Sequence, residues 1–424
     1  MTSSLAKQFN VLLVGKGARE HALAWKLSRS PSVKHFYVVP GNGGAAALQN
    51  VSNIEHVAAN DYQKLVSLSK QHEVGLVVVG PDDAIMDRIE GGVPCFAPSK
   101  EAAGIEGSKT YAKDFMRRHG IPTAEYRSFE DGDAQAYLND ESTNSRVVIK
   151  VDGLASGKGV VLPVDRAEAH QALKDMMLGG KFSSAGNSVV IEDYLDGDEI
   201  SVLTLSDGRT SKSFPLGQDH KRIYYSNKGP NTGGTGVNAP VPFVSSKQMA
   251  EIERKILQPT FEGLEAEGRT FVGMLFTGIM LASSGPKVLE YNARFGDPET
   301  QTMMMLLSDD DFAAILLACA QGKLHQVELN ITPGFSCNVV IEAGGYPEEY
   351  CKGDVITLSD CPPGVQDFHA GTQYEDGVLK TAGGRVFSVA ARGETLEEAV
   401  ATAYQGVESI QFEGMFYRKD IAAR

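Results

Sequence analysis

The chain has 424 residues, 42% of them hydrophobic and 22% charged, which is typical of a soluble globular protein with two or three domains. The net charge of −14 argues against a nucleic-acid or anionic-membrane partner, and no apolar run is long enough to span a bilayer. The five cysteines never occur as C-x-x-C and no secretory pattern opens the chain, so we expect a cytoplasmic protein with reduced thiols.

The first hundred residues alternate apolar runs with helical patterns. Three runs are continuously apolar and end in turns that contain glycine: 11–14, 36–39 and 76–79. A helix after the first run carries Ala18, Ala22 and Trp25 on one face. Apolar strands separated by helices predict a parallel α/β sheet, which binds its ligands at the carboxyl ends of the strands.

From about residue 145 the pattern changes to pairs of strands joined by short loops. Three antiparallel hairpins are predicted: 147–150 with 160–164, 189–192 with 200–205, and 271–281 with 287–292. The last ninety residues add strands at 337–343 and 385–391 and a helix at 396–406. This part of the chain is therefore of the α+β class.

The turn Gly15-Lys16-Gly17 ends a strand and opens a helix. It is similar to a dinucleotide fingerprint, but Glu20 takes the place of the third glycine and Pro40-Gly41 stands where an acid would end the second strand. NAD or FAD is therefore disfavoured. The helix N-terminus still suits a phosphate or a carboxylate, with Arg19 adding charge, and an ordinary tight turn is the alternative.

The loop from Gly153 to Gly159 lies between two predicted strands and contains Gly157 and Lys158. It is not a Walker A loop, because no Ser or Thr follows Lys158 and a strand, not a helix, comes next. Glycine permits close approach of phosphate oxygens, and a lysine on such a loop can neutralise a transferring phosphoryl group. Lys150, at the end of the preceding strand, is a second candidate cation. A plain glycine-rich hairpin is the alternative.

Glu290 and Asn292 lie on one face of the strand at 287–292, because side chains of a strand alternate with a period of two. Arg294 continues that face, whereas Leu289 and Tyr291 point toward a core. A carboxylate and an amide oxygen are hard ligands that suit a Mg²⁺ ion bridging phosphates. A half-exposed strand with its polar residues outward is the alternative.

A long polar region runs from Asp219 to Gly236 and includes Lys221. A loop of this length is costly to order, so a ligand-facing role is plausible, and disorder is the alternative. Nothing in the sequence pairs His220, His21 or His369 with a nucleophile.

Taken together, these residues resemble the glycinamide ribonucleotide synthetase (phosphoribosylamine–glycine ligase) family. The resemblance runs nearly end to end, and the stretch from Arg294 to Gln301 is its most specific part. The motifs that carry it are GKGAREHALAWKL from Gly15, PGNGG from Pro40, VIKVDGLASGKGVV from Val148, DHKR from Asp219, GPNTGGTG from Gly229, LEYNARFGDPETQ from Leu289 and AGGYP from Ala343.

The resemblance implies an ATP-grasp fold with an N-terminal Rossmann-like domain (1–105), an ATP-grasp domain (106–335, with a lid at about 122–195) and a small C-terminal β-rich domain (336–424). It implies ligation of glycine to 5-phosphoribosylamine, with ATP becoming ADP and phosphate, by a monomer or weak homo-oligomer. Another ATP-grasp ligase and a non-catalytic nucleotide sensor are the competing hypotheses.

The resemblance also assigns residues. Those matched to ATP binding are Lys109, Lys150, Gly157, Lys158, Gly159, Glu192, Asp193, Tyr194, Leu195 and Glu199. Those matched to Mg²⁺ or Mn²⁺ are Glu290 and Asn292. Those matched to the two substrates are Gly17, Arg19, Glu20, Asn42, Gly43, Gly44, Pro81, Asp82, Asp219, Lys221, Arg294 and Asp297. Lys158, Arg294 and Asp297 are expected to act in catalysis.

The chain departs from the family pattern at a few positions. Asp82, usually Glu, keeps its charge but has a shorter reach, so its substrate contact is the least secure assignment. Lys16, Ala18, Asp193 and Thr235 also differ from the commoner residues. The predicted strand at 271–281 has no acidic residue, so a metal would depend on Glu290, Asn292 and phosphate oxygens.

Overall fold

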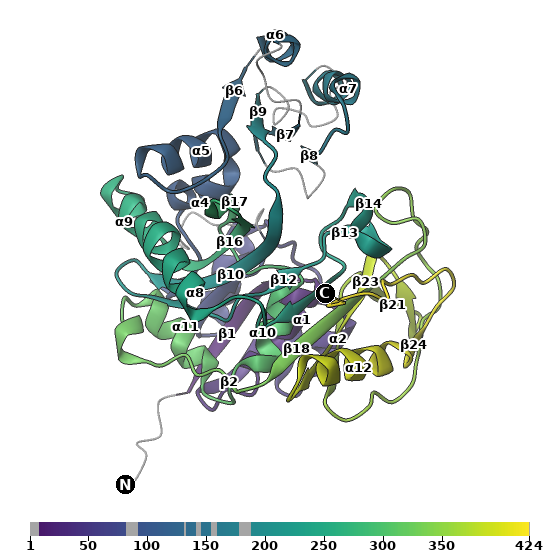
Figure 1. Ribbon diagram of the computed structural model, residues 1–424. Helices are drawn as coiled ribbons and strands as arrows, with labels where there is room; N and C mark the ends of the chain where they lie inside the picture. The colour runs from purple at the N-terminus through teal and green to yellow at the C-terminus, as the bar shows by residue number, and fades with distance from the viewer. Residues whose placement is uncertain are drawn as a thin grey trace.

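The computed structural model describes residues 8–81, 92–130, 133–140, 146–153, 159–177 and 188–423. Figure 1 shows a large body, from which a smaller lobe with α6, α7 and β6 to β9 projects at the top of the view. No helix in these ranges is long and apolar enough to cross a bilayer. The five cysteines are free thiols, as expected.

The N-terminal part is a parallel five-stranded sheet in the order β3-β2-β1-β4-β5, which confirms the prediction. Its strands are β1 (Phe9–Gly15), β2 (Val33–Pro40), β3 (Val51–Asn53), β4 (Val74–Val79) and β5 (Cys95–Phe96). Its helices are α1 (Ala18–Leu27), α2 (Gly43–Ala46) and α3 (Tyr62–Gln71). Side chains of β1 alternate between two cores, with Val11 and Leu13 in one and Leu12 and Val14 in the other. Burial on both faces explains the continuous apolar runs.

Helix α1 is buried on every side and not on one face alone, which differs from the sequence-based expectation. It lies between the sheet, α10 (Glu299–Leu306) and β20 (Val365–His369). His21 on α1 accepts a hydrogen bond at Nδ1 from the backbone N–H of His369, at 2.9 Å. Burial, with His369 nearby, lowers the pKa of His21 to about 3. The two histidines therefore join the N-terminal part to the C-terminal part.

The projecting lobe contains an antiparallel sheet in the order β6-β9-β7-β8 and a small core of its own. Its elements are β6 (Tyr126–Phe129), α6 (Asp133–Asn139), β7 (Val147–Val151), β8 (Val160–Val161), α7 (Arg166–Met177) and β9 (Val189–Asp193). The predicted hairpin of β7 with β8 is confirmed.

The central sheet has the order β11-β10-β16-β17, with β10 (Gly197–Asp207), β11 (Ser211–Ser213), β16 (Val272–Ala282) and β17 (Gly285–Asn292). The β16–β17 hairpin is as predicted. The predicted pairing of 189–192 with 200–205 is wrong, because β9 pairs with β6 and β7 whereas β10 pairs along its whole length with β16. The acidic turn between β9 and β10 connects two sheets and does not close a hairpin.

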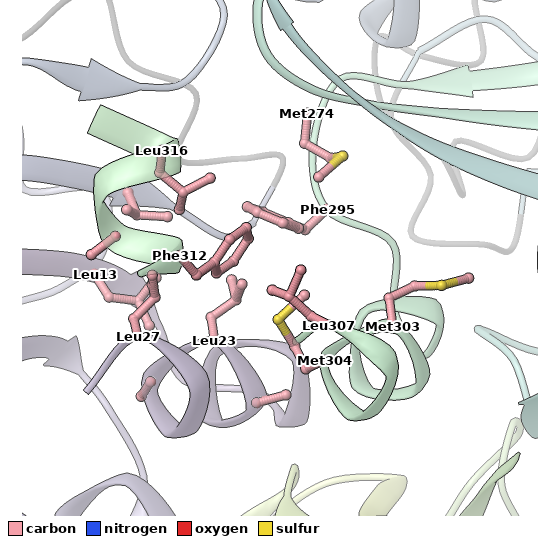
Figure 2. Close-up of a cluster of buried hydrophobic side chains, with 14 of the residues drawn as sticks. Leu13, Leu23, Leu27, Met274, Phe295, Met303, Met304, Leu307, Phe312 and Leu316 are labelled. Atoms are coloured by element: carbon pink, nitrogen blue, oxygen red, sulfur yellow. The ribbon is translucent and has the colours of Figure 1, made fainter. Parts of the chain in front are cut away.

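Helices cover the central sheet: α4 (Lys100–Gly107), α5 (Lys109–Arg118), α8 (Ser246–Ile252), a π-helical turn (Glu253–Leu257), α9 (Gln258–Ala266) and α11 (Phe312–Ala320). Figure 2 shows Leu13, Leu23 and Leu27 of the N-terminal part against Phe295, Met304 and Phe312. One apolar core therefore joins the N-terminal sheet to the segment that follows β17.

The C-terminal sheet has the order β12-β15-β18-β23-β20, with β12 (Gln218–Asp219), β15 (Gly236–Ala239), β18 (Phe335–Glu342) and β23 (Arg385–Gly393). Helix α12 (Leu396–Val407) packs on β18 and β23. Three two-stranded ribbons complete the part: β13 (Arg222–Tyr224) with β14 (Lys228–Asn231), β19 (Thr357–Leu358) with β24 (Ile410–Gln411), and β21 (Thr372–Glu375) with β22 (Val378–Thr381). The predicted strands and final helix are confirmed.

Candidate active site

Lys109 and Lys150 approach the same region from two elements. Lys109 begins α5 and donates through Nζ to the carbonyl of Gly153, at 2.8 Å, where the glycine-rich loop starts. Lys150, on β7, donates to the carbonyl of Leu289 on β17, at 3.0 Å. Gly159 lies on the far side of that loop and its carbonyl accepts from Val151 N at 2.9 Å. The two lysines therefore lie at the base of the loop, and their role as phosphate ligands stays a prediction.

Glu192, on β9, forms ion pairs with both Lys150 and Lys113. The exposed fractions of the three side chains are 3% for Glu192, 6% for Lys150 and 3% for Lys113. Burial alone would raise the pKa of Glu192, but the two ammonium groups outweigh burial and lower it. Burial lowers the pKa of Lys113 to about 8, against the pull of Glu192. We call Lys109, Lys113 and Lys150, with Glu192, the lysine cluster.

The segment from Glu192 to Leu195 crosses from the lobe sheet to the central sheet. Asp193 N donates to the carbonyl of Glu125 at 2.9 Å, and Tyr194 N donates to the carbonyl of Arg146 at 3.1 Å. The Arg146 guanidinium lies over the Tyr194 ring, with 3.6 Å between its carbon and the ring centroid. This segment is thus a fixed link between two sheets, and its role in holding adenine stays a prediction.

Glu290 and Asn292 lie on β17, and Glu290 lies next to Lys221. Lys221 Nζ is 2.5 Å from Glu199 Oε1 and 3.3 Å from Glu290 Oε1. Burial would raise the pKa of Glu290, but Lys221, Lys150 and Lys109 lower it to about 2, so this side chain is a carboxylate. Tyr291 points into the core as predicted, whereas Leu289 lies at a β-bulge and is only half-buried. The bulge comes before Glu290, so the period of two still places Glu290 and Asn292 on one face of β17.

The structure gives Arg294 and Asp297 different partners. Arg294 donates to the carbonyl of Phe295 at 3.1 Å and to Asn292 Oδ1 at 3.3 Å, and its Nη2 is 3.4 Å from Glu106 Oε1. Asp297 Oδ2 accepts from Arg385 Nη2 at 2.7 Å, and its Oδ1 accepts from Gln301 Nε2 at 2.8 Å. Arg294 and Asp297 are therefore held separately.

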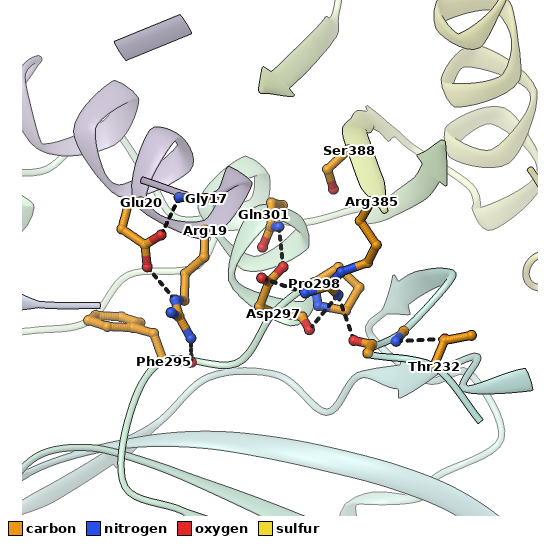
Figure 3. Close-up of polar contacts among 12 residues, drawn as sticks. Gly17, Arg19, Glu20, Thr232, Phe295, Asp297, Pro298, Gln301, Arg385 and Ser388 are labelled. Carbon is orange, nitrogen blue, oxygen red and sulfur yellow. Dashed lines mark hydrogen bonds and ion pairs between the residues drawn. The ribbon is translucent and has the colours of Figure 1, made fainter. Parts of the chain in front are cut away.

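Arg385 and Arg19 complete this group. Figure 3 shows Arg19 beside Phe295 and Arg385 beside Asp297. Arg385 Nη1 donates to the carbonyls of Gly233 at 2.6 Å and of Asp297 at 3.0 Å. Arg19 donates to Glu20 Oε1 at 2.6 Å and to the carbonyl of Phe295 at 3.1 Å. Burial alone would raise the pKa of Asp297, but the charges of Arg385 and Arg19 outweigh burial and lower this pKa. We call Arg19, Arg294 and Arg385, with Asp297, the arginine cluster.

The first glycine turn is organised around Glu20. Its Oε2 accepts a 2.6 Å hydrogen bond from Gly17 N, and a Cβ at Gly15 or Gly80 would overlap the Glu20 side chain. Gly15 also has a φ of +134°, which favours glycine. These glycines therefore bring the ends of β1 and β4 close to α1. Pro81, directly after Gly80, is half-buried.

Asn42 caps the short helix that begins with Gly43 and Gly44. Its Oδ1 accepts from Ala45 N at 2.9 Å, and its Nδ2 donates to the carbonyls of Lys16 and His369, both at 2.8 Å. These bonds fix the Asn42 side chain within the turn, and its role toward a substrate stays a prediction. Half-buried Gly43 lies beside it, whereas Gly44 is buried against His21.

Asp219, on β12, lies in an acidic setting with Lys221. Burial, together with Glu299, raises the pKa of Asp219 well above its usual value. Burial would lower the pKa of Lys221, but Glu199 and Glu290 raise it. Lys221 thus lies between Glu290 and the Asp219 carboxyl, and the substrate roles of Asp219 and Lys221 stay predictions. Gly157, Lys158 and Asp82 lie outside the described residues.

Sequence reasoning did not single out Lys113, Arg385, Glu106 or Asp152. Asp152 accepts from Ser108 Oγ at 3.0 Å and from Thr110 N at 3.1 Å, and so fixes the start of α5. A signal existed for Lys113, because it follows Lys109 by four residues and so shares its helix face. Arg385 gave no local signal, since its partner Asp297 is 88 residues away in the chain.

Three family descriptions match the chain in sequence order. The phosphoribosylglycinamide synthetase N domain matches residues 9–106, the ATP-grasp (A) domain residues 107–300 and the C domain residues 336–424. A bifunctional purine biosynthetic protein of Schizosaccharomyces pombe is 49% identical over 420 residues, covering 97% of the chain and 53% of that protein. The chain spans about half the length of the bifunctional relatives it matches.

Bacterial relatives match over almost their whole length. A phosphoribosylamine–glycine ligase of Vibrio vulnificus is 42% identical over 426 residues, 98% of each chain. The crystal structure of the Thermotoga maritima phosphoribosylamine–glycine ligase is 33% identical, with a TM-score of 0.85, over 97% of this chain and 100% of that one. The biotin carboxylase domain of Hydrogenobacter thermophilus 2-oxoglutarate carboxylase shares only the fold, at 15% identity and a TM-score of 0.70. The chain therefore belongs to the phosphoribosylamine–glycine ligase family and has its ATP-grasp fold.

Proposed function

We propose that the chain joins glycine to 5-phosphoribosylamine with ATP, giving glycinamide ribonucleotide, ADP and phosphate in purine biosynthesis. The observation that carries this proposal is the position of Glu290 and Asn292, which lie between the lysine cluster and the arginine cluster. A ligase of this kind needs cations for a nucleotide on one side and a carboxylate site on the other. Both lie next to one strand, β17.

ATP would bind at the lysine cluster. Lys109 and Lys150 would neutralise nucleotide phosphates, and the loop with Gly157, Lys158 and Gly159 would cover them. The link from Glu192 to Leu195 would hold the adenine, and Glu199 the ribose. Support comes from the geometry, since Lys109 and Lys150 both lie at the base of this loop.

Glu290 and Asn292 fit a Mg²⁺ or Mn²⁺ ion that is shared with a nucleotide. They offer one carboxylate and one amide oxygen, the hard donors that such ions prefer. Within the described ranges no group of three or more His, Cys, Asp or Glu could hold a metal, and nucleotide phosphate oxygens and water would complete the ligand set. The bound ion would neutralise phosphate charge, and Lys221 beside Glu290 supplies positive charge from the protein.

Two chemical steps account for the reaction. A glycine carboxylate oxygen attacks the γ-phosphorus of ATP, so that glycyl phosphate forms and ADP leaves. The amine of phosphoribosylamine then attacks the acyl carbon, forms the amide and releases phosphate and a proton. Arg294 would bind the glycine carboxylate and Asp297 its ammonium group. Positioning and charge neutralisation suffice, so the protein needs no nucleophile.

Phosphoribosylamine would bind where the N-terminal turns meet the central site. The residues proposed to border it are Gly17, Arg19, Glu20, Asn42, Gly43, Gly44, Pro81, Asp82, Asp219 and Lys221. We further propose that the protein is a monomer or weak homo-oligomer that works in the cytoplasm, which suits its free thiols.

ADP release, measured with each substrate alone and with both, tests this function. We expect fast release only when glycine and phosphoribosylamine are both present, and a Mg²⁺ titration of Glu290→Gln should need more metal for half-maximal rate than wild type. Fast release with another acid–amine pair, or none with any pair, would contradict the proposal.

A further inference from the structure

Glu192 has two lysine partners that come from different parts of the molecule. Lys150 lies on β7 of the projecting lobe, as Glu192 lies on its β9, whereas Lys113 lies on α5 beside the central sheet. Lys113 is anchored on that side, because its Nζ donates to Thr123 Oγ1 at 2.7 Å, and this hydroxyl donates to the carbonyl of Val288 on β17 at 2.7 Å. Lys113 thus connects the lobe to the central sheet through one carboxylate.

The second lysine changes what Lys150 can do. A carboxylate that is 3% exposed cannot lose its only cation without a large penalty, because water cannot reach it to compensate. With Lys113 in place, Glu192 keeps a counter-ion when Lys150 moves away. Two ammonium groups on one carboxylate also repel each other, so each is held less tightly than a single lysine would be.

We propose that Lys113 is a positioning residue that stays on Glu192 and so allows Lys150 to leave this carboxylate for a nucleotide phosphate. The inference rests on the proposed function in one respect, namely that Lys150 binds phosphate. Lys113 itself touches no nucleotide in this scheme. It acts through the charge of Glu192, which separates it from a residue that only braces the fold.

The test compares ligands with and without phosphates. Lys113→Met keeps a long unbranched side chain and removes its charge. Arg117→Met, at an exposed position of the same helix, is the matched control. Calorimetry would give the dissociation constants of a non-hydrolysable ATP analogue with Mg²⁺ and, by competition, of adenosine. We expect Lys113→Met to weaken the analogue by roughly tenfold or more, since Lys150 is then tied to Glu192, and to leave adenosine nearly unchanged.

A second pair of variants removes the carboxylate. In a Glu192→Gln background, Lys113→Met should cost the analogue little, because the carboxylate that pairs with Lys150 is already gone. If Lys113→Met does not fold, Thr123→Val removes its anchor without removing a charge and should weaken the analogue, but not adenosine, by a smaller factor.

Three outcomes would overturn the inference: unchanged affinity for the analogue, equal losses for analogue and adenosine, or the same loss with Glu192→Gln present. Lys150→Met separates this failure from that of the proposed function. If Lys150→Met also leaves analogue binding intact, the assignment of the phosphate site is wrong; if it weakens binding while Lys113→Met does not, only the role of Lys113 is wrong.

Discussion

The lysine cluster and the arginine cluster hold their charges in different ways. Each lysine offers a single Nζ on a long stem, and Lys113 and Lys150 share one carboxylate. Each arginine uses two or more nitrogens and also binds a backbone carbonyl, that of Phe295 for Arg19 and Arg294. A planar guanidinium held in this way keeps one orientation, whereas an ammonium group can change partners.

This difference suggests a division of labour within one site. The arginine cluster is already organised around the segment that follows β17. It would therefore be a preformed binding site for the carboxylate of the substrate. The lysine cluster would rearrange when a nucleotide enters, because its cations are paired with Glu192 and with carbonyl groups that a phosphate can replace. In this scheme the lysine cluster is the movable side of the site and the arginine cluster is the fixed side.

The largest effect is expected at Lys158, the lysine of the glycine-rich loop. Lys158→Ala should lower kcat by roughly 10²–10³, or about 3–4 kcal/mol, because a cation near the transferring phosphoryl group is lost. Thermal melting should hardly change. Lys174→Ala, at an exposed position of α7, is the control. Wild-type kcat in Lys158→Ala would mean that Lys158 does not act in phosphoryl transfer.

A smaller and more selective effect is expected at Arg294. Arg294→Lys keeps the charge but loses the two-nitrogen fork, so the KM for glycine should rise roughly tenfold while the KM for ATP stays nearly constant. Steady-state kinetics with each substrate varied in turn would measure both values. Arg392→Lys, at an exposed position near the end of β23, is the control. Equal shifts in the two KM values, with a lower melting temperature, would mean that Arg294 only braces the turn through Glu106.

The smallest effect concerns stability and not turnover. Burial lowers the pKa of His21 from 6.5 to about 3, so the folded protein keeps this ring neutral. Its stabilising contribution is present above pH 6.5 and is lost as the pH falls towards 3, because the unfolded chain takes up the proton first. The melting temperature of His21→Asn should therefore fall less steeply than that of wild type over this range. His325→Asn, at an exposed position, should follow wild type, and parallel curves for His21→Asn would refute the role of His21.

Local sequence patterns were sufficient for the elements that carry the site. The apolar run from Val11 to Val14 predicts a strand buried on both faces, and the period of two places Glu290 with Asn292. Pairing between distant strands is not a local property, however. The turn after β9 has the polar residues of a hairpin, but the partner of β10 is β16, some seventy residues later in the chain.

The same limit applies to side chains. Lys113 has the appearance of an ordinary helix lysine, and only the fold brings Glu192 of β9 to it. Arg385 lies in a strand whose sequence is typical of a β-rich domain, and it reaches Asp297 because α10 packs against β18 and β23. Residues that complete a site from another part of the chain have no pattern of their own to reveal them.

Strand pairing in the C-terminal sheet limits where the protein can be cut into separately expressed fragments. Its strand β15 (Gly236–Ala239) comes from the middle of the chain and pairs with β18, which begins at Phe335. A protein ended before β18 would leave β15 with a bare edge, and a fragment that starts at 336 would expose the other half of this ladder. Such edges invite aggregation, so separate expression of either piece should give insoluble protein unless both are produced together. The two fragments thus correspond to separate sequence domains, but we expect neither to fold independently.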